Sequence, residues 1–154
     1  MEKTKTERPS WDEYFMEIAD VVSKRSNCAS RKVGAVITVD NQIIATGYNV
    51  APKGLHHCED AGGCLRKLNN IESGTRQEIC RAVHAEQNAI IQAAVRGVSI
   101  KGGTLYTNTY PCSICTRMII NAEIKKIVYD SDYSDKLSKE MLEESGIKVL
   151  RLKR

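Results

Sequence analysis

Two short motifs constrain this chain most, because together they carry the ligands of a metal ion. The first is His84-Ala85-Glu86, and the second is Pro111-Cys112-Ser113-Ile114-Cys115. One imidazole and two thiolates supply three ligands to a tetrahedral Zn²⁺ and leave the fourth position open for water, as in catalytic zinc sites. Zinc lowers the pKa of such a water to about 7, and a carboxylate beside it can move protons. His84, Cys112 and Cys115 are therefore the predicted zinc ligands, and Glu86 is the predicted catalytic carboxylate.

The sequence around both motifs predicts helices that start at the metal. Small residues from Ala85 to Ala93 run to Gly97 and predict a helix with His84 and Glu86 in its first turn. A second helix is expected after Pro111, with both cysteines in its first turn. Its helical spacing is carried by Cys115, Met118, Ile119 and Ala122. The positive ends of two helices would then converge on one metal and help hold the cysteines as thiolates.

Two other interpretations of these motifs are a four-coordinate structural zinc and a chance C-x-x-C beside an unrelated histidine. C-x-x-C alone is weak evidence. The glutamate two residues after His84 and the proline before Cys112 favour the catalytic interpretation.

H-x-E…P-C-x-x-C is the signature of zinc-dependent nucleobase deaminases. Within that superfamily the chain most resembles the deoxycytidylate (dCMP) deaminase family, including its ComE operon protein 2 group. The resemblance covers about residues 10–152 and rests on three further motifs: Arg31-Lys32-Val33-Gly34-Ala35-Val36-Ile37, Thr46-Gly47-Tyr48-Asn49 with Pro52 and Gly54, and Cys58…Cys64-Leu65-Arg66. It implies hydrolysis of dCMP to dUMP and ammonia, in which Glu86 protonates N3 of cytosine and then the departing amine.

The resemblance also implies substrate contacts. Asn49 is expected to hydrogen-bond the sugar, and Tyr133 to pack on the base. Arg31, Lys32 and Lys53 are candidate ligands of the phosphate, although a surface cation is usually only solvated.

Effectors and assembly are implied in the same way. Many members of the family are activated by dCTP and inhibited by dTTP, so both nucleotides are candidate effectors, and Gln92 and Arg96 are the places to look for their contacts. The resemblance further implies a homo-oligomer, a hexamer.

Other functions stay open. Alternative substrates are dCTP, CMP and a tRNA adenosine. Nucleoside cytidine deaminases typically have Cys at the position of His84, riboflavin-pathway deaminases have a longer gap between the cysteines, and tRNA adenosine deaminases generally lack the cysteine-bearing insertion after Asn49. A different class of function is a noncatalytic, zinc-stabilised DNA-uptake accessory. Glu86 argues against it, because a scaffold requires no carboxylate beside an open metal site.

Composition limits the organisation and the partners of the chain. With 154 residues, 42% of them hydrophobic, residues 10–154 are expected to form one domain behind a flexible tail of residues 1–9. No apolar run approaches eighteen residues and the start is polar, so we expect no membrane span, no secretory signal and a cytoplasmic location. A net charge of +4 without a basic block suits an anionic nucleotide and does not favour a long nucleic acid.

Four of the six cysteines lie outside the main motif, namely Cys28, Cys58, Cys64 and Cys80. They are enough for a second, structural zinc, which would pin residues 49–79, a segment without helical or strand periodicity. By resemblance, some phage-type dCMP deaminases carry a second zinc whose ligands include cysteines matching Cys28 and Cys58. His56 or His57 is a substitute ligand in this hypothesis, and buried free thiols are the alternative.

The remaining elements predict an α/β fold. A capping box at Ser10 and Glu13 starts a helix that runs to about Arg25, with Trp11 in the core. Strands are expected at 33–39, 42–48, 104–108, 126–130 and 147–152, with a hairpin turn at Asp40-Asn41 and a helix at 137–145 that ends at Gly146. An antiparallel hairpin joined to parallel strands makes a mixed five-stranded sheet between helical layers. This three-layer α/β/α sandwich is also the cytidine deaminase fold that the resemblance implies.

Overall fold

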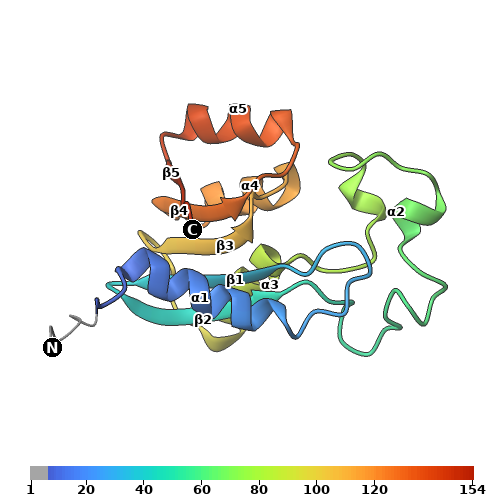
Figure 1. The fold of residues 1–154 in the computed structure, drawn as a ribbon, viewed down its shortest axis with the longest axis horizontal. Helices are drawn as coiled ribbons and strands as arrows, with labels where there is room; N and C mark the ends of the chain where they lie inside the picture. Colours follow the sequence, from blue (N-terminus) through green and yellow to red (C-terminus); the bar gives the residue numbers. More distant parts are fainter. Residues whose placement is uncertain (1–6) are drawn as a thin grey trace, which may run out of the picture.

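A mixed sheet lies at the centre of the fold in the computed structural model, which describes residues 7–154 (Figure 1). The strands in this part of the chain are β1 (Gly34–Val39), β2 (Gln42–Tyr48), β3 (Thr104–Thr109), β4 (Lys126–Ser131) and β5 (Lys148–Arg151). The helices are α1 (Trp11–Ser23), α2 (Leu65–Leu68), α3 (Ala85–Arg96), α4 (Ser113–Asn121) and α5 (Lys136–Ser145), with a 3₁₀ turn η1 (Gln77–Ile79).

The order of the five strands is β2-β1-β3-β4-β5. β1 is antiparallel to β2 and β3, whereas β3, β4 and β5 run parallel. The predicted mixed five-stranded sheet is confirmed, and each predicted strand lies within two residues of the observed one. At the hairpin turn, Asp40 and Asn41 have φ of 51° and 57°, the left-handed backbone that a tight two-residue turn requires.

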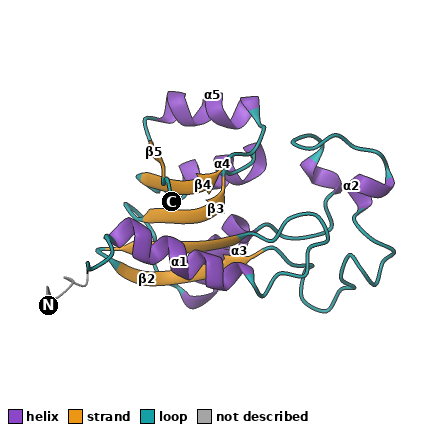
Figure 2. Cartoon of the chain, viewed as in Figure 1, coloured by secondary structure: helices purple, strands orange, loops and turns teal. Residues whose placement is uncertain are grey.

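Each face of the sheet carries its own hydrophobic cluster, because successive strand residues point to opposite faces. The cluster beneath α1 consists of Phe15, Met16, Ala19, Val36, Tyr106 and Val128. The cluster beneath α3 and α4 includes Ala35, Ile37, Ala85, Ala89, Leu105, Cys115, Ile119 and Ile127. Neighbouring residues such as Leu105 and Tyr106 therefore contact different helices. The sheet lies between helical layers, as expected for an α/β/α sandwich (Figure 2).

α3 packs so closely on β2 that only glycine fits at the contact. A Cβ on Gly47 would lie 2.3 Å from the carbonyl oxygen of Ala85 and 2.4 Å from the amide nitrogen of Ala89. The alanines on the inner face of α3 allow the same close approach. This contact holds the start of α3, and with it the first zinc motif, against the sheet.

The first helix differs from its prediction in two ways. The capping box is confirmed, since Ser10 Oγ accepts from the Glu13 amide and Glu13 accepts from the Ser10 amide, but α1 ends at Ser23. Placing Trp11 in the core was wrong, because its side chain is 50% exposed and stacks on Phe15 with ring centroids 5.6 Å apart. Trp11 lies in the first turn of α1, and Phe15, one turn later on the same face, is the buried member of the pair.

Residues 49–79 contain the short helix α2 and the 3₁₀ turn η1, so this segment is less irregular than its sequence indicates. It projects from one end of the sheet (Figure 1). The Arg66 guanidinium crosses it and donates to the carbonyls of Glu72 and Thr75. An isolated bridge joins Val50, at the start of the segment, to Val83, just after its end.

Two expectations concern the ends of the chain and membranes. Residues 1–6 of the predicted tail lie outside the described residues, so the division into a tail and one domain stays a prediction. Between residues 7 and 154, every helix is too short or too polar to cross a bilayer.

Candidate metal centre and active site

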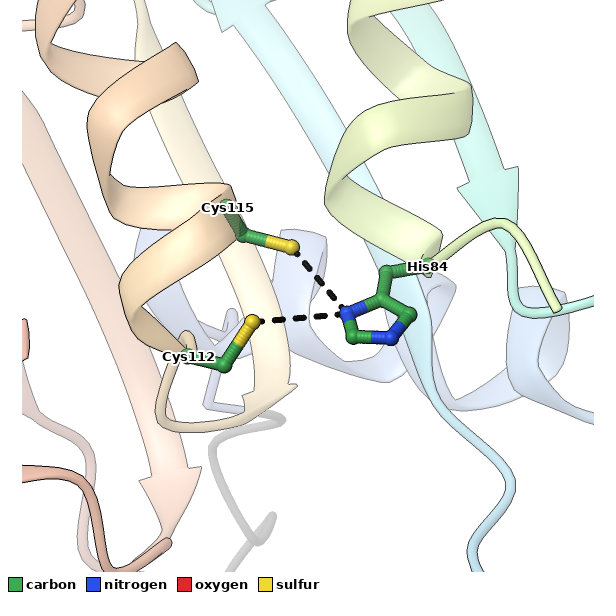
Figure 3. A group of neighbouring side chains, drawn as sticks. All are labelled: His84, Cys112 and Cys115. Atoms are coloured by element: carbon green, nitrogen blue, oxygen red, sulfur yellow. Dashed lines mark hydrogen bonds between the residues drawn. The ribbon is translucent and has the colours of Figure 1, made fainter. Parts of the chain in front are cut away.

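The three predicted zinc ligands come together at the starts of two helices. His84 is the N-cap residue of α3, Cys112 is the N-cap residue of α4, and Cys115 lies in the first turn of α4. Nδ1 of His84 lies 3.4 Å from Sγ of Cys112 and 3.3 Å from Sγ of Cys115 (Figure 3). Within residues 7–154, this is the only group of three or more such side chains whose ligand atoms all lie within 4.8 Å of one another.

This geometry fits a tetrahedral zinc ion. Zn–S bonds of about 2.3 Å and a Zn–N bond of about 2.0 Å place nitrogen and sulfur ligands about 3.5 Å apart. The observed separations of 3.4 and 3.3 Å are close to that value. One nitrogen and two sulfur donors are a zinc ligand set, and three protein ligands leave one coordination position for water or substrate.

Shared protons shift the pKa values of all three ligands. A hydrogen bond from Cys115 lowers the pKa of Cys112 to about 4, and the same bond raises the pKa of Cys115 well above its usual range. Burial would lower the pKa of His84, but hydrogen bonds to Cys112 and Cys80 raise it to about 10. The three side chains are thus linked by hydrogen bonds and mutual charge. Zinc binds thiolates and a neutral imidazole, so metal binding would release the protons of these ligands.

Glu86 lies beside these ligands in the first turn of α3, with only 4% of its surface exposed. Its Oε1 accepts a hydrogen bond of 3.0 Å from Oγ1 of Thr107 in β3. Burial raises the pKa of the Glu86 carboxyl, the nearby His84 opposes that rise, and Cys112 adds to it. A carboxyl with a raised pKa is suited to accept and return protons near neutral pH.

Asp135, just before α5, ties α4 to its neighbour. Its Oδ2 accepts from the Ser113 amide at 2.7 Å, and its Oδ1 accepts from the Ser138 amide at 3.0 Å. Ser138 also donates its hydroxyl to the Pro111 carbonyl at 2.7 Å. The turn that carries Cys112 is therefore held from both sides by the first turn of α5.

A cavity of about 190 Å³, here called the site cavity, opens onto His84, Glu86 and Cys112. Three of the predicted substrate contacts also line it, namely Arg31, Asn49 and Tyr133. The Arg31 guanidinium lies 5.5 Å from the centre of the Tyr133 ring. The Tyr133 hydroxyl accepts from the Gly74 amide at 3.1 Å and from the Gln77 side chain. The structure thus brings residues from distant parts of the chain together around one cavity.

The Asn49 side chain is partly engaged with the backbone. Its Oδ1 accepts from the Val33 amide at 2.9 Å, and its Nδ2 donates to the Arg31 carbonyl at 2.7 Å. An amide side chain has two N–H groups and two lone pairs, so one donor and one acceptor position remain for a ligand.

The two predicted lysine ligands of the phosphate lie elsewhere. Lys32 is outside the lining of the site cavity, and Lys53 lines a separate cavity of about 560 Å³ between β2 and α3, here called the β2 cavity. Gln92 and Arg96 also line the β2 cavity. Sequence alone places a lysine near a motif but does not show on which side of the chain its side chain lies.

The four remaining cysteines gather near the site cavity. Cys28, Cys64 and Cys80 line it. Burial raises the pKa of Cys58, and the neighbouring Cys80, Cys28 and Cys64 raise it further. Burial would also raise the pKa of Cys80, but a side-chain hydrogen bond to His84 lowers it. The structure therefore brings the four thiols into one neighbourhood, although within residues 7–154 they form no cluster as tight as the first.

The two candidate substitute ligands precede Cys58 directly in the chain. The carbonyl of His56 accepts from Arg81 at 2.9 Å. His57 lines the β2 cavity, and its buried Nδ1 has no hydrogen-bond partner among the described residues.

Three residues of the site were missed in the sequence. Arg66 lines the site cavity, and its place in the Cys64-Leu65-Arg66 motif was a usable signal. Asp135 precedes Ser138 by three residues, the spacing of a helix N-cap. Thr107 carries no signal of its own, because a threonine in a predicted strand is ordinary.

Comparisons with known proteins agree with this site. The family described as "Cytidine and deoxycytidylate deaminase zinc-binding region" matches residues 9–131. The chain belongs to this family. The deoxycytidylate deaminase of Schizosaccharomyces pombe is 40% identical over 143 residues, which cover 92% of this chain and 44% of that protein. The ComE operon protein 2 of Bacillus subtilis is 38% identical over 144 residues, which cover 93% of this chain and 71% of that protein.

Among solved structures, the dCMP deaminase of cyanophage S-TIM5 in complex with dCMP and dUMP has a TM-score of 0.77 and 32% sequence identity. The match covers 95% of this chain and 99% of that chain. The predicted family and sandwich fold are thereby confirmed. The chain spans less than half the length of the Schizosaccharomyces pombe relative, 44%.

Proposed function

We propose that this chain is a zinc-dependent hydrolase that deaminates dCMP to dUMP and releases ammonia. One observation carries the proposal: a buried glutamate lies beside three zinc ligands at the wall of a small cavity. Relatives named deoxycytidylate deaminase and a neighbour solved with dCMP and dUMP support this substrate over other cytosine compounds.

In this reaction the three metal ligands and Glu86 have separate roles. His84, Cys112 and Cys115 would hold the zinc, which when bound would activate a water at neutral pH. Glu86 accepts a proton from that water as the water oxygen bonds to C4 of the cytosine ring, and delivers the proton to N3. Glu86 then carries the second proton of the former water to the amino group at C4; the C4–N bond breaks and ammonia leaves, while the oxygen stays on C4 as a carbonyl. The walls of the site cavity hold the base beside Glu86 and limit the access of other water.

Two arginines in the site cavity are the proposed phosphate ligands. Arg31 was a candidate from the sequence, and Arg66 joins it because it lines the same cavity. Arg66 uses its Nε and one terminal nitrogen on the carbonyls of Thr75 and Glu72, so its other terminal nitrogen is available. Guanidinium groups fixed in this way suit a phosphate, which accepts several charged hydrogen bonds.

Ammonia release from a panel of substrates tests the activity. The panel contains dCMP, deoxycytidine, CMP, dCTP and an adenosine in a tRNA anticodon stem-loop. We expect kcat/KM for dCMP to exceed that for deoxycytidine by at least about tenfold, a modest demand on a charged phosphate contact. Faster reaction of deoxycytidine or of the tRNA adenosine would show that the monophosphate assignment is wrong. No ammonia from any member would favour the noncatalytic accessory function.

A second, structural zinc bound by Cys28, Cys58, Cys64 and Cys80 belongs to the same proposal. Its support is the mutual proximity of these thiols: burial raises the pKa of Cys58, and the three neighbouring cysteines raise it further. Such an ion would order residues 49–79. Free thiolate ligands persist in a reducing compartment, which fits a cytoplasmic location. Elemental analysis should find two zinc ions per chain, and Cys64→Ser should lower that number by one. One zinc per chain with four titratable thiols would identify them as free cysteines.

The β2 cavity is the proposed effector site. Lys53 and Arg96 give it two cationic side chains, which suit the triphosphates of dCTP and dTTP, and the Nδ1 of His57 has no hydrogen-bond partner among the described residues. The exposed apolar side chains Ile91, Val95 and Val98 on and after α3 support a homo-oligomer, with a hexamer as the expected size. Sedimentation tests the homo-oligomer, and turnover of dCMP with and without dCTP tests the effector site. A monomer whose activity does not respond to dCTP would contradict this part of the proposal.

A further inference from the structure

Thr107 lies at the centre of the sheet and reaches the proposed catalytic carboxylate. It is fully buried in β3, where it pairs with Ala35 of β1 and Tyr129 of β4. Its Oγ1 lies 3.0 Å from Oε1 of Glu86, and both side chains are buried. A hydrogen bond to a buried carboxylate is stronger than one at the surface, because water does not compete for either partner.

The hydroxyl of Thr107 has three neighbours but only one proton. It lies 3.1 Å from the Thr109 carbonyl oxygen and 3.4 Å from the Thr109 amide nitrogen, in addition to Glu86. The amide can only donate, so it occupies a lone pair of the hydroxyl. Of the two acceptors, a carboxylate binds the proton more strongly than a neutral carbonyl. The hydroxyl is thereby oriented toward Glu86 by the backbone that leads to Cys112.

From this geometry we infer that Thr107 is a positioning residue for deamination, an inference that rests on the proposed function. Its hydroxyl fixes one oxygen of the Glu86 carboxylate, and proton transfer then uses the other oxygen from a defined place. The same hydroxyl contacts the backbone of Thr109, which lines the site cavity. It therefore fixes the position of the Glu86 carboxylate relative to the cavity wall. A displacement of about 1 Å at a reacting group can lower a rate about a hundredfold.

Two substitutions at this position separate positioning from packing. Thr107→Val keeps the branched shape and removes the hydroxyl, whereas Thr107→Ser keeps the hydroxyl and removes a methyl group. We expect Thr107→Val to lower kcat for dCMP by about ten- to a hundredfold with KM and zinc content unchanged. Thr107→Ser should stay within about threefold of the unchanged protein, because it retains the hydrogen bond.

Thr38→Val is the matched control, since Thr38 is a buried threonine of β1 that pairs with Thr104, at the other end of β3. It should leave kcat unchanged. If Thr107→Val does not fold, Thr107→Ala replaces it, and its kcat should again fall below that of Thr107→Ser at equal zinc content. The inference is overturned if the variant without the hydroxyl keeps its kcat, if both Thr107 variants lose activity alike, or if the loss lies only in KM.

Failure of the proposed function has a different signature. In that case the unchanged, zinc-loaded protein releases no ammonia from dCMP, or Glu86→Gln keeps full turnover. Failure of the inference alone leaves both of those results as proposed and affects only the comparison between Thr107→Val and Thr107→Ser.

Discussion

Replacing Asp135 with alanine should weaken both the fold and the zinc site. The carboxylate of Asp135 is buried and accepts from Ser113 in α4 and from Ser138 in α5. Ser113 lies between the two cysteine ligands in the chain. Alanine removes both hydrogen bonds and leaves one amide in the first turn of each helix without its acceptor.

The size of the effect follows from these two bonds. Loss of one N-cap typically costs about 0.5–2 kcal/mol, and hydrogen bonds to charged groups contribute about 1.5–3 kcal/mol each. For two buried bonds we expect a loss of about 2–4 kcal/mol in the free energy of unfolding. In a domain of this size that corresponds to a decrease in Tm of about 5–15 °C.

The zinc site should respond as well, because the Ser113 amide helps to set the turn that carries Cys112 and Cys115. Residues that orient metal ligands typically account for about 10- to 100-fold in metal affinity. We therefore expect Asp135→Ala to raise the Kd for zinc by that factor in a competition titration with a chelator.

Asp132→Ala in the same loop is the control. Its carboxylate is 54% exposed and pairs with Arg151, and exposed ion pairs contribute about 1 kcal/mol or less. The reasoning is refuted if Asp135→Ala melts within a few degrees of Asp132→Ala and binds zinc with unchanged affinity.

Three further predictions test the substrate cavity and the packing around it. In steady-state kinetics, Arg66→Ala should raise KM for dCMP about tenfold and leave KM for deoxycytidine unchanged. Lys53→Ala should change neither KM, and equal effects of the two variants would contradict the role of Arg66. Gly47→Ala should lower the free energy of unfolding by at least about 3 kcal/mol in denaturant titrations, because its Cβ would lie 2.3 Å from a backbone oxygen of α3; wild-type stability would be inconsistent with that contact. Tyr133→Phe removes the hydroxyl that accepts from the Gly74 amide, so amide hydrogen exchange in residues 72–80 should become faster. Unchanged exchange would show that this hydrogen bond does not hold the segment.

Local signals explain why the metal centre was predictable. His84 and Cys112 both lie at helix starts, and each motif brings its own helix-start features, such as Pro111 and the alanine stripe of α3. The sheet was predictable for the same reason, because the β-branched runs and the Asp40-Asn41 turn are signals within a few residues.

Contacts between distant residues could not be predicted in this way. Thr107 meets Glu86 across 21 positions of sequence, and Asp135 meets Ser113 across 22. Trp11 shares a face of α1 with the buried Phe15 but is the first residue of the helix, and the sequence does not show how far the core extends toward that end. Lys53 lies close to Asn49 in the chain, yet its side chain lines the β2 cavity and not the site cavity.

Turnover of dCMP by Glu86→Gln tests the central claim most directly. The amide keeps the size of the side chain but cannot exchange protons, so the variant should retain its zinc and its fold while ammonia release from dCMP falls by about a hundredfold or more. Zinc content and turnover are measured on the same samples, beside the unchanged protein. A zinc-loaded Glu86→Gln variant with near wild-type activity would contradict the assignment of Glu86 as the group that moves the protons.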